Sequence, residues 1–381
     1  MNPFDLGPSA PLAPPLFTSA VYTLPDLDAL DAIYDGKAAG FIYARDGHPN
    51  ARHLATQLAA IENGAWAVVC GSGMAALSAA FLGLLSPGDA VLASDRLYGR
   101  TTQLLKQQLS RFGVKTVSVD VSDLGATRTA AAAHKPKVIY AETISNPLCR
   151  VPDLPALAEI ARAHGGRLVV DNTFATPVLC RPLDLGADLV MESLTKMIGG
   201  HSDVILGSLA GTDRELLPGI EQIVSVWGLA VSPFPCWQAE RGLLTLGVRM
   251  RAATANAAAV ADWLAGRPEV VRVVYPGRAD HPDHGLAVKL LAGGCGNMLC
   301  FELAGGREAV NRFMRSAPGI PFSPSLGHAR TTISYPAGTS HRFDSPEVKR
   351  AQGITDGLIR MSVGCEPLEE LQRELAKGLQ G

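Results

Sequence analysis

Short apolar runs alternate with helical segments from residue 52 to residue 209, and this alternation limits the available folds more than any other feature. The apolar runs predict strands at 91–94, 115–119, 137–141, 167–170, 188–191 and 204–209. The intervening segments predict helices at 52–63, 74–85, 98–111, 123–134 and 153–164. Strands that alternate with helices build a mostly parallel sheet covered on both faces. We therefore predict an α/β fold.

The pattern changes near Trp237, and we divide the chain into three parts. Residues 1–50 hold many prolines and predict an extended N-terminal arm. Residues 51–236 carry the alternating strands and helices of the α/β domain. Residues 237–381 begin with an alanine-rich helical stretch at 250–264 and continue with shorter elements. We expect this last part to form a smaller C-terminal α+β domain.

Composition and charge are typical of a soluble protein. The 381 residues are 47% hydrophobic and 18% charged, and the formal net charge is −2 without a long basic run. The apolar stretches are interrupted well short of a membrane span, and the proline-rich start lacks the features of a secretory signal. Seven cysteines without CxxC spacing fit reduced thiols. We expect a cytoplasmic protein that binds neither nucleic acid nor membrane.

Lys196 and Asp171 each stand where an apolar strand runs out into polar residues. Ligands of open α/β sheets bind outside the carboxyl ends of such strands. An amine and a carboxylate placed at that edge could together bind the cofactor pyridoxal 5'-phosphate (PLP). The lysine condenses with its aldehyde, and the carboxylate keeps its pyridine nitrogen protonated. The alternative is that Lys196 caps a strand in solvent and Asp171 opens a turn.

A glycine-containing turn, Gly71 to Met74, precedes a predicted helix and offers backbone N–H groups to an anion. Ser193 and Thr195 lie two residues apart beside Lys196, where their hydroxyls can reach the same phosphate. A plain tight turn and ordinary strand-end capping are the alternatives. We predict no metal site, since the H-P-D-H segment at 281–284 has a proline between its histidines and no further ligand at helical spacing.

Several segments together resemble the cystathionine γ-synthase/γ-lyase group of PLP enzymes, the Cys/Met-metabolism family, which includes the methionine γ-lyases. They follow the family's order over nearly the whole chain. The segments are Y-A-R (43–45), G-S-G-M-A-A (71–76), L-Y-G (97–99), E-T-I-S-N-P (142–147), D-N-T-F-A-T-P (171–177), S-L-T-K (193–196), G-G-H-S-D-V (199–204), S-L-G (325–327) and L-I-R-M-S-V-G-C-E (358–366).

The resemblance implies PLP fold type I, the aspartate-aminotransferase-like fold, and a homotetramer built from two dimers that share active sites. It implies that Lys196 binds the cofactor and moves substrate protons, that Asp171 pairs with the pyridinium nitrogen, and that Tyr98 stacks on the ring and assists as acid or base. The other implied cofactor contacts are made by Gly73, Met74, Asn146, Thr173, Ser193 and Thr195.

Two further sets of residues receive roles from the resemblance. Tyr43 and Arg45 of the N-terminal arm reach the phosphate of the neighbouring subunit, and Tyr43 also assists catalysis there. A guanidinium such as that of Arg45 is well shaped for phosphate. Arg360 holds the α-carboxylate of the substrate, with Ser325 beside it.

The sequence departs from the family pattern at three places. Arg330 stands where many members have glutamate, so it either favours a distal carboxylate on the substrate or faces solvent. Arg100 stands where methionine γ-lyases usually have cysteine, which counts against methionine as the main substrate. The loop D-G-H-P-N at 46–50 replaces the more usual G-N-P-T, and we expect His48 and Asn50 to make the turn.

The predicted function is a PLP-dependent C–S lyase that acts on sulfur amino acids by γ-elimination, with cystathionine-like substrates. A γ-synthase that joins a thiol to activated homoserine is the main alternative, and a β-lyase is a third. A non-catalytic protein on a PLP-enzyme scaffold fits less well, because the lysine, the aspartate and the phosphate residues are all present. An aminotransferase shares such a lysine and aspartate, but the S-L-T-K and E-T-I-S-N-P segments resemble the Cys/Met-metabolism family far more closely.

Overall fold

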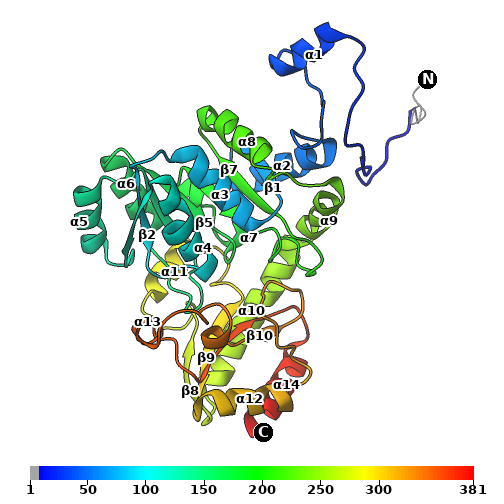
Figure 1. The fold of residues 1–381 in the computed structure, drawn as a ribbon. Helices are drawn as coiled ribbons and strands as arrows, with labels where there is room; N and C mark the ends of the chain where they lie inside the picture. Colours follow the sequence, from blue (N-terminus) through cyan, green and yellow to red (C-terminus); the bar gives the residue numbers. More distant parts are fainter. Residues whose placement is uncertain (1–7) are drawn as a thin grey trace.

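The computed structural model describes residues 8–381, so the first seven residues of the predicted arm lie outside the described part. A large sheet of seven strands and a smaller one of four form the molecule (Figure 1). The large sheet has the order β1-β7-β6-β5-β4-β2-β3. Its strands are β1 (Trp66–Cys70), β2 (Ala90–Ser94), β3 (Lys115–Val119), β4 (Val138–Glu142), β5 (Arg167–Asp171), β6 (Leu189–Glu192) and β7 (Gly207–Gly211). This confirms the predicted α/β fold.

The pairing of the strands follows the prediction except at one side of the sheet. Strands β2 to β6 run parallel, whereas β7 lies antiparallel to both β6 and β1. Strand β1 was not among the predicted strands, and β7 begins at Gly207 rather than at residue 204. Gly207 packs against the backbone of Ser72 and Gly73, so contacts with a distant turn decide where β7 begins.

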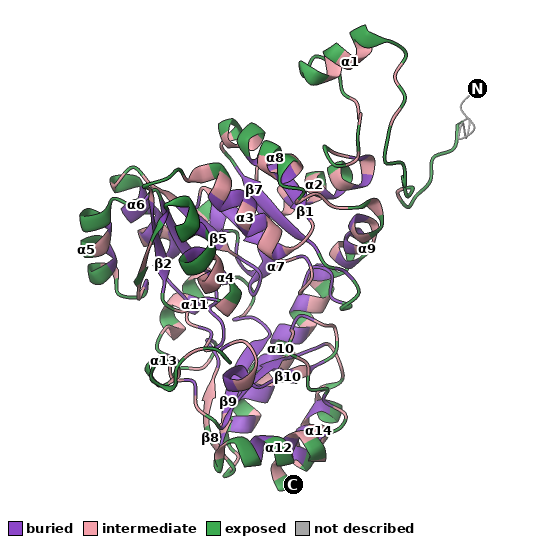
Figure 2. Ribbon diagram, viewed as in Figure 1, coloured by how far each residue is buried: buried purple, intermediate pink, exposed green. Residues whose placement is uncertain are grey.

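The central strands are buried and apolar except at their ends, because both faces of the sheet are covered (Figure 2). Val169 of β5 belongs to the core on one face, and its neighbours Leu168 and Val170 belong to the core on the other. Helices α3 (Gly73–Leu84) and α8 (Leu217–Val226) cover the first face, and α2 (Pro49–Glu62), α5 (Leu124–His134) and α6 (Leu154–Ala163) cover the second.

The helix predicted at 98–111 is interrupted. The structure has α4 (Gly99–Gln103), a π-helical turn at Leu104–Gln108 and a 3-10 turn at Leu109–Phe112. The buried side chains of Leu105 and Leu109 hold these turns against the sheet. A π-helical turn adds a residue to the helix and is frequent at functional sites.

The smaller sheet is antiparallel in the order β10-β11-β9-β8, formed by Thr332–Ser334, Leu358–Ser362, Met298–Leu303 and Val270–Val274. Helix α10 (Leu246–Ala265), predicted at 250–264, contacts β8 and β9 at one end and α7 (Thr176–Leu179) and α9 (Pro233–Leu244) near the large sheet. The remaining helices are α11 (His284–Leu290), α12 (Gly306–Ser316), α13 (Pro346–Ala351) and α14 (Leu368–Gln380). No helix within residues 8–381 is long and apolar enough to cross a membrane.

The N-terminal arm, for which the sequence predicts an extended course, contains one helix among its described residues. Helix α1 (Leu27–Tyr34) begins after Asp26, whose side chain accepts a hydrogen bond of 2.8 Å from Ala29 N. No residue of α1 is buried, and the helix stands away from both sheets (Figure 1). The arm therefore has surface available for another chain.

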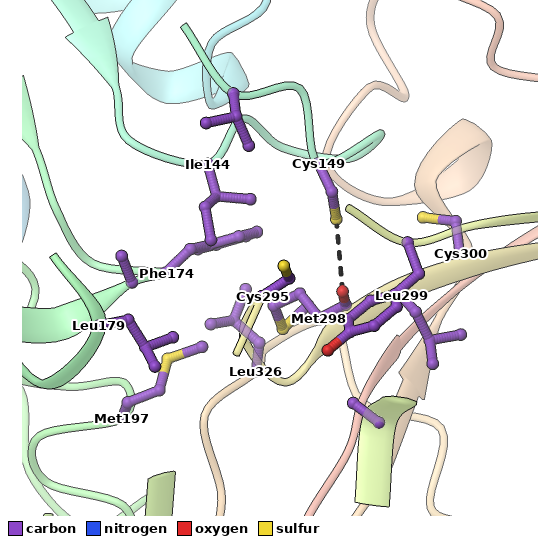
Figure 3. Packing of buried hydrophobic residues seen from close by; sticks show 14 of the residues in the cluster. Ile144, Cys149, Phe174, Leu179, Met197, Cys295, Met298, Leu299, Cys300 and Leu326 are labelled. Atoms are coloured by element: carbon purple, nitrogen blue, oxygen red, sulfur yellow. Dashed lines mark hydrogen bonds between the residues drawn. The ribbon is translucent and has the colours of Figure 1, made fainter. Parts of the chain in front are cut away.

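Sulfur-containing side chains fill part of the core between the two sheets (Figure 3). Cys149, Cys295 and Cys300 are buried there close to Phe174 and Met298. All seven cysteines are free. The cysteines of this region act as small apolar side chains.

Two carboxyl groups are buried beside each other beneath the large sheet. Glu62 ends α2 and Glu192 ends β6, and they are only 2% and 1% exposed. Their four oxygens have no hydrogen-bond partner of normal geometry, although the two groups and Asn172 lie close together. Burial raises the pKa of Glu62 to about 7 and that of Glu192 well above its ordinary value. The pair holds protons that the unfolded chain releases.

We predict that this acid pair makes the folded chain less stable in alkali. The stabilisation is complete below pH 4.5, the ordinary pKa, and is lost as the pH rises through about 7. A shift of this size corresponds to about 3 kcal/mol. Glu62→Gln should therefore reduce the drop in melting temperature between pH 5 and pH 8. The exposed Glu159→Gln is the control, and an equal drop in both variants would contradict the prediction.

Candidate active site

A cavity of about 670 Å³ opens at the carboxyl ends of β4, β5 and β6. Eleven of the predicted site residues line it, and they come from both sheets and the loops between them. They are Gly73, Met74, Tyr98, Asn146, Asp171, Thr173, Ser193, Thr195, Lys196, Ser325 and Arg360. Residues from distant parts of the chain thus meet in one cavity.

Lys196 stands in a turn that follows β6. Its backbone N–H donates to Ser193 O at 3.0 Å, and its Nζ donates to Ser325 Oγ at 2.9 Å. Burial, and then the positive charge of Arg360, lower the pKa of Lys196. The amine is therefore neutral at a lower pH than an exposed lysine, as a nucleophile or a base requires.

Gly327 explains why the S-L-G segment lies against Lys196. Its φ is +81°, and a Cβ atom there would stand 2.6 Å from the carbonyl carbon of Lys196 and from Met197 N. Only glycine permits both the conformation and the contact. Gly327 N also donates to Ser362 Oγ at 2.9 Å, which fixes the segment to β11. Ser325 is positioned opposite Lys196 as a result.

Asp171 ends β5 and lines the cavity. One of its oxygens, Oδ1, accepts a hydrogen bond of 2.9 Å from Thr173 N. Burial raises the pKa of Asp171, and the hydrogen bonds of Thr173 partly oppose this. A cation beside the carboxylate would favour its ionised form. The site therefore suits a protonated ring nitrogen.

The start of α3 forms a place for an anion. Ser72 caps the helix, its Oγ accepting from Ala75 N at 3.0 Å, and Gly73 and Met74 follow as the first helical residues. A Cβ atom on Gly73 would lie 3.0 Å from Ser193 Cβ, so the turn and the Ser193 segment are in close contact. Free N–H groups at a helix N-terminus attract phosphate.

Arg360 is buried in the middle of β11 and has no carboxylate partner among the described residues. Its Nη1 donates to Asn146 Oδ1 at 2.8 Å and its Nη2 donates to the carbonyl of Ser325 at 3.0 Å. Its Nε is buried without a partner. Burial lowers the pKa of Arg360 from a value so high that the group stays charged. This uncompensated cation is suited to a substrate carboxylate.

Glu142 is a site residue to which the sequence analysis gave no role, although it begins the E-T-I-S-N-P segment. Its Oε1 accepts from Tyr98 N at 2.6 Å and its Oε2 accepts from Asn146 N at 3.0 Å. It is paired with Asp171 in the register of β4 and β5. Burial and the charge of Asp171 raise its pKa to about 8. Glu142 thus positions both Tyr98 and Asn146.

Tyr43 and Arg45 do not reach this cavity within one chain. They line a separate cavity of about 310 Å³ beside α2 and α8, and the Arg45 guanidinium lies 5.3 Å from the centre of the Tyr43 ring. Both side chains are exposed. Contact with a cofactor phosphate would have to be made in another subunit.

The three departures from the family pattern differ in outcome. Arg330 does not line the cavity and is exposed, so of its two predicted roles the structure supports the solvent-facing one. Arg100 lines the outer part of the cavity. His48 caps α2 through a bond of 3.1 Å from Ala51 N to its Nδ1, and Asn50 bonds to Phe17 N and Pro15 O, which confirms the predicted turn.

A family model described as Cys/Met metabolism PLP-dependent enzyme matches residues 8–380. The chain belongs to this family. It is therefore a PLP-dependent enzyme of the class that comprises C–S lyases and transsulfuration transferases. The family prediction and the predicted cofactor are both confirmed.

Similar family members catalyse different reactions. The chain is 38% identical to the L-methionine gamma-lyase of Pseudomonas putida, over 99% of this chain and 94% of the relative. It is 40% identical to a cystathionine beta-lyase of Bacillus subtilis, over 88% and 85%. The solved cystathionine gamma synthase of Xanthomonas oryzae pv. oryzae, in complex with cystathionine, has a TM-score of 0.91 at 36% identity and covers 97% of this chain and 92% of that one. Membership of the family therefore does not determine which of these reactions this chain catalyses.

The cavity fits PLP. Lys196 offers an amine with a lowered pKa, Asp171 a buried carboxylate, and the start of α3 a set of free N–H groups. Tyr98, which is 40% exposed, offers an aromatic ring at the cavity wall. We propose that these residues hold the aldehyde carbon, the ring nitrogen, the phosphate and the ring face of the cofactor, respectively.

We predict that Glu142→Gln weakens catalysis through the two segments it holds. The amide keeps one acceptor but presents an NH₂ group to a backbone donor, which leaves a buried N–H unsatisfied. The cost of about 1–3 kcal/mol should lower kcat/KM about tenfold. Glu302→Gln, which breaks an ion pair with Arg272 in the smaller sheet, is the control. An unchanged kcat/KM and an unchanged affinity for PLP would contradict the role of Glu142.

Proposed function

We propose that this enzyme is a C–S lyase that eliminates the γ-substituent of a cystathionine-like amino acid. The main support for the proposal is the hydrogen bond of 2.9 Å from Lys196 Nζ to Ser325 Oγ. The carbonyl of the same serine accepts from Arg360. The amine proposed to move protons and the guanidinium proposed to bind the carboxylate therefore both contact Ser325. An amino acid held by Arg360 has its α-carbon beside Nζ.

When bound, PLP supplies an aldehyde that captures the substrate amine and a ring that withdraws electrons from the α-carbon. Lys196 Nζ takes the α-proton, and its lowered pKa makes the neutral amine available for this. Arg360 holds the carboxylate, and Tyr98 stands at the wall as a further acid or base. Lys196 Nζ then takes a proton from the β-carbon. The electron pair of that Cβ–H bond forms a Cβ–Cγ double bond, and the electron pair of the Cγ–S bond leaves with sulfur, which takes a proton. L-Cystathionine and water give cysteine, 2-oxobutyrate and ammonia.

A γ-synthase is the second candidate, and the TM-score of 0.91 to a cystathionine gamma synthase supports it. The two reactions share their early proton transfers and differ in whether a thiol or water ends the reaction. A β-lyase releases pyruvate instead of 2-oxobutyrate. The seven free cysteines support a reducing, cytoplasmic setting for any of the three.

The reaction product distinguishes these candidates. With PLP and L-cystathionine we expect 2-oxobutyrate, identified by chromatography after derivatisation of the keto acid. Pyruvate would contradict the proposal in favour of a β-lyase. Neither product, together with cystathionine formation from activated homoserine and cysteine, would favour the γ-synthase. A preparation of the Lys196→Ala variant controls for contaminating activity.

We also propose that the arm completes the active site of a neighbouring subunit within a homotetramer of two dimers. Tyr43 and Arg45 lie in an exposed segment that does not reach the cavity of its own chain, and the residues proposed to hold the phosphate, Gly73, Met74, Ser193 and Thr195, include no cationic side chain. A partner's arm would supply that cation.

Mixed assemblies test this sharing. Arg45→Ala and Lys196→Ala should each have little activity, but one site of a mixed dimer keeps its own Lys196 and receives an intact Arg45. Co-expression should therefore restore about one quarter of the wild-type activity, because half of randomly paired dimers carry one intact site of two. Activity equal to the mean of the two parent variants would show that the sites are not shared.

A further inference from the structure

The lysine turn, as we call residues 193–200 around Lys196, ends in two buried carbonyl groups that it does not satisfy itself. Lys196 O accepts a hydrogen bond of 2.8 Å from Gly200 N. In the described part of the chain, no backbone N–H donates to the carbonyls of Met197 or Ile198, although these residues are only 2% and 1% exposed. A buried carbonyl without a donor costs free energy. The turn therefore needs donors from another element.

Arg249 supplies these donors from α10, the helix that runs between the two sheets (Figure 1). Its Nη1 donates to Met197 O at 2.5 Å, and its Nη2 donates to Ile198 O at 3.0 Å. Nη2 also donates to Gly242 O of α9 at 2.6 Å, and Nε donates to Thr245 Oγ1 at 3.0 Å. Four hydrogen bonds fix one planar group. The guanidinium therefore joins α9 and α10 to the lysine turn in one orientation.

The guanidinium of Arg249 is half-buried, and all four of its acceptors are neutral oxygens. Among residues 8–381, Arg249 forms no ion pair. Burial lowers its pKa, but from a value so high that the group stays charged. Burying a charge without a carboxylate is costly, and packing of α10 alone does not need one. Hydrogen bonds from a cation are stronger than those from a neutral donor, so the charge holds the carbonyls of the lysine turn firmly.

A glycine at position 200 allows the guanidinium to come this close. Gly200 has a φ of +75°, and a Cβ atom there would lie 2.2 Å from Arg249 Nη1. The carbonyl of Gly200 accepts from Ala329 N at 2.7 Å. Ala329 follows two residues after Gly327, which itself packs against Lys196. The lysine turn is therefore held by the S-L-G segment and by Arg249 together.

We propose that Arg249 is a positioning residue that keeps the main chain of Lys196 in place while the lysine amine moves. In the proposed reaction Nζ takes protons from the α-carbon and the β-carbon, so the side chain must swing about a fixed backbone. Arg249 does not line the cavity. Burial and Arg360 are the causes that lower the pKa of Lys196, and Arg249 is not among them. Arg249 therefore acts through the hydrogen bonds to the turn. The inference rests on the proposed function for the two proton transfers.

Capture of the cofactor tests this inference without turnover. The full chain is freed of cofactor with hydroxylamine, PLP is added, and the bond to Lys196 is trapped with borohydride and located by mass spectrometry. Arg249→Lys keeps the charge but loses the planar fork, and Arg249→Gln loses both. Each variant should capture PLP about tenfold more slowly, the effect of losing one charged hydrogen bond. The pH dependence of capture should move to higher pH, because a lysine in a loosened turn is less buried and its pKa is lowered less.

Steady-state kinetics with L-cystathionine give a second readout. In both Arg249 variants kcat should fall on the order of a hundredfold, the cost of displacing a reacting group by about 1 Å. KM should change less than about threefold, because β11 holds Arg360 independently. Thr245→Val removes one acceptor of the guanidinium but leaves both bonds to the lysine turn, and it should give the same pattern with a smaller amplitude. Arg251→Gln, an exposed arginine on the same helix, is the matched control.

Melting temperatures separate positioning from a merely structural role. Arg249 variants that melt at a lower temperature but keep the wild-type kcat and the wild-type pH dependence of capture would overturn the inference. Full recovery of both readouts in Arg249→Lys would overturn it as well, since a lysine cannot reproduce the fork. The γ-lyase proposal fails on a different result, a wild-type enzyme that releases no 2-oxobutyrate from cystathionine. The capture measurement does not depend on that product.

Discussion

The buried guanidinium of Arg360 is the group on which the cavity depends. Removing a positive charge from water is costly, and this one has only the neutral oxygens of Asn146 and Ser325 as partners. The charge of Arg360 has two effects in the same cavity. Burial is the larger cause of the lowered pKa of Lys196, and the charge of Arg360 lowers this pKa further. The same unpaired charge also attracts a carboxylate.

The hydrogen bonds around Arg360 also join the two sheets. Asn146 follows β4 of the large sheet, and its backbone is held by Glu142, whose other oxygen holds Tyr98. Ser325 precedes β10 of the smaller sheet and reaches Lys196 beyond β6. A change in either sheet thus moves the groups proposed to bind the cofactor and those proposed to bind the substrate together. The carboxylate of Glu142 is as much a part of this arrangement as the residues that face the cavity.

Most of the large sheet could be predicted because each central strand is apolar except at its ends and each is followed by a polar turn. The edge pairing of β1 with β7 could not, since it depends on the contact of Gly207 with the Ser72–Gly73 turn. Motifs located eleven of the residues that line the cavity, but not Glu142, which acts through backbone donors distant in sequence. The proposed contribution of Arg45 requires a second chain, and no property of its own segment reveals the partner. The π-helical turn after α4 was also missed, because its apolar spacing resembles that of an ordinary helix.

The close packing of Gly327 against Lys196 has a consequence for how the protein is made. The lysine, the turn proposed to bind the phosphate, and Asp171 all belong to the first two hundred residues and leave the ribosome early. The segment that presses on the lysine follows more than a hundred residues later, and Arg360 comes almost at the end of the chain. A nascent chain therefore carries a lysine that has not yet been placed by its packing partner. Capture of the cofactor in its working geometry belongs to the completed polypeptide.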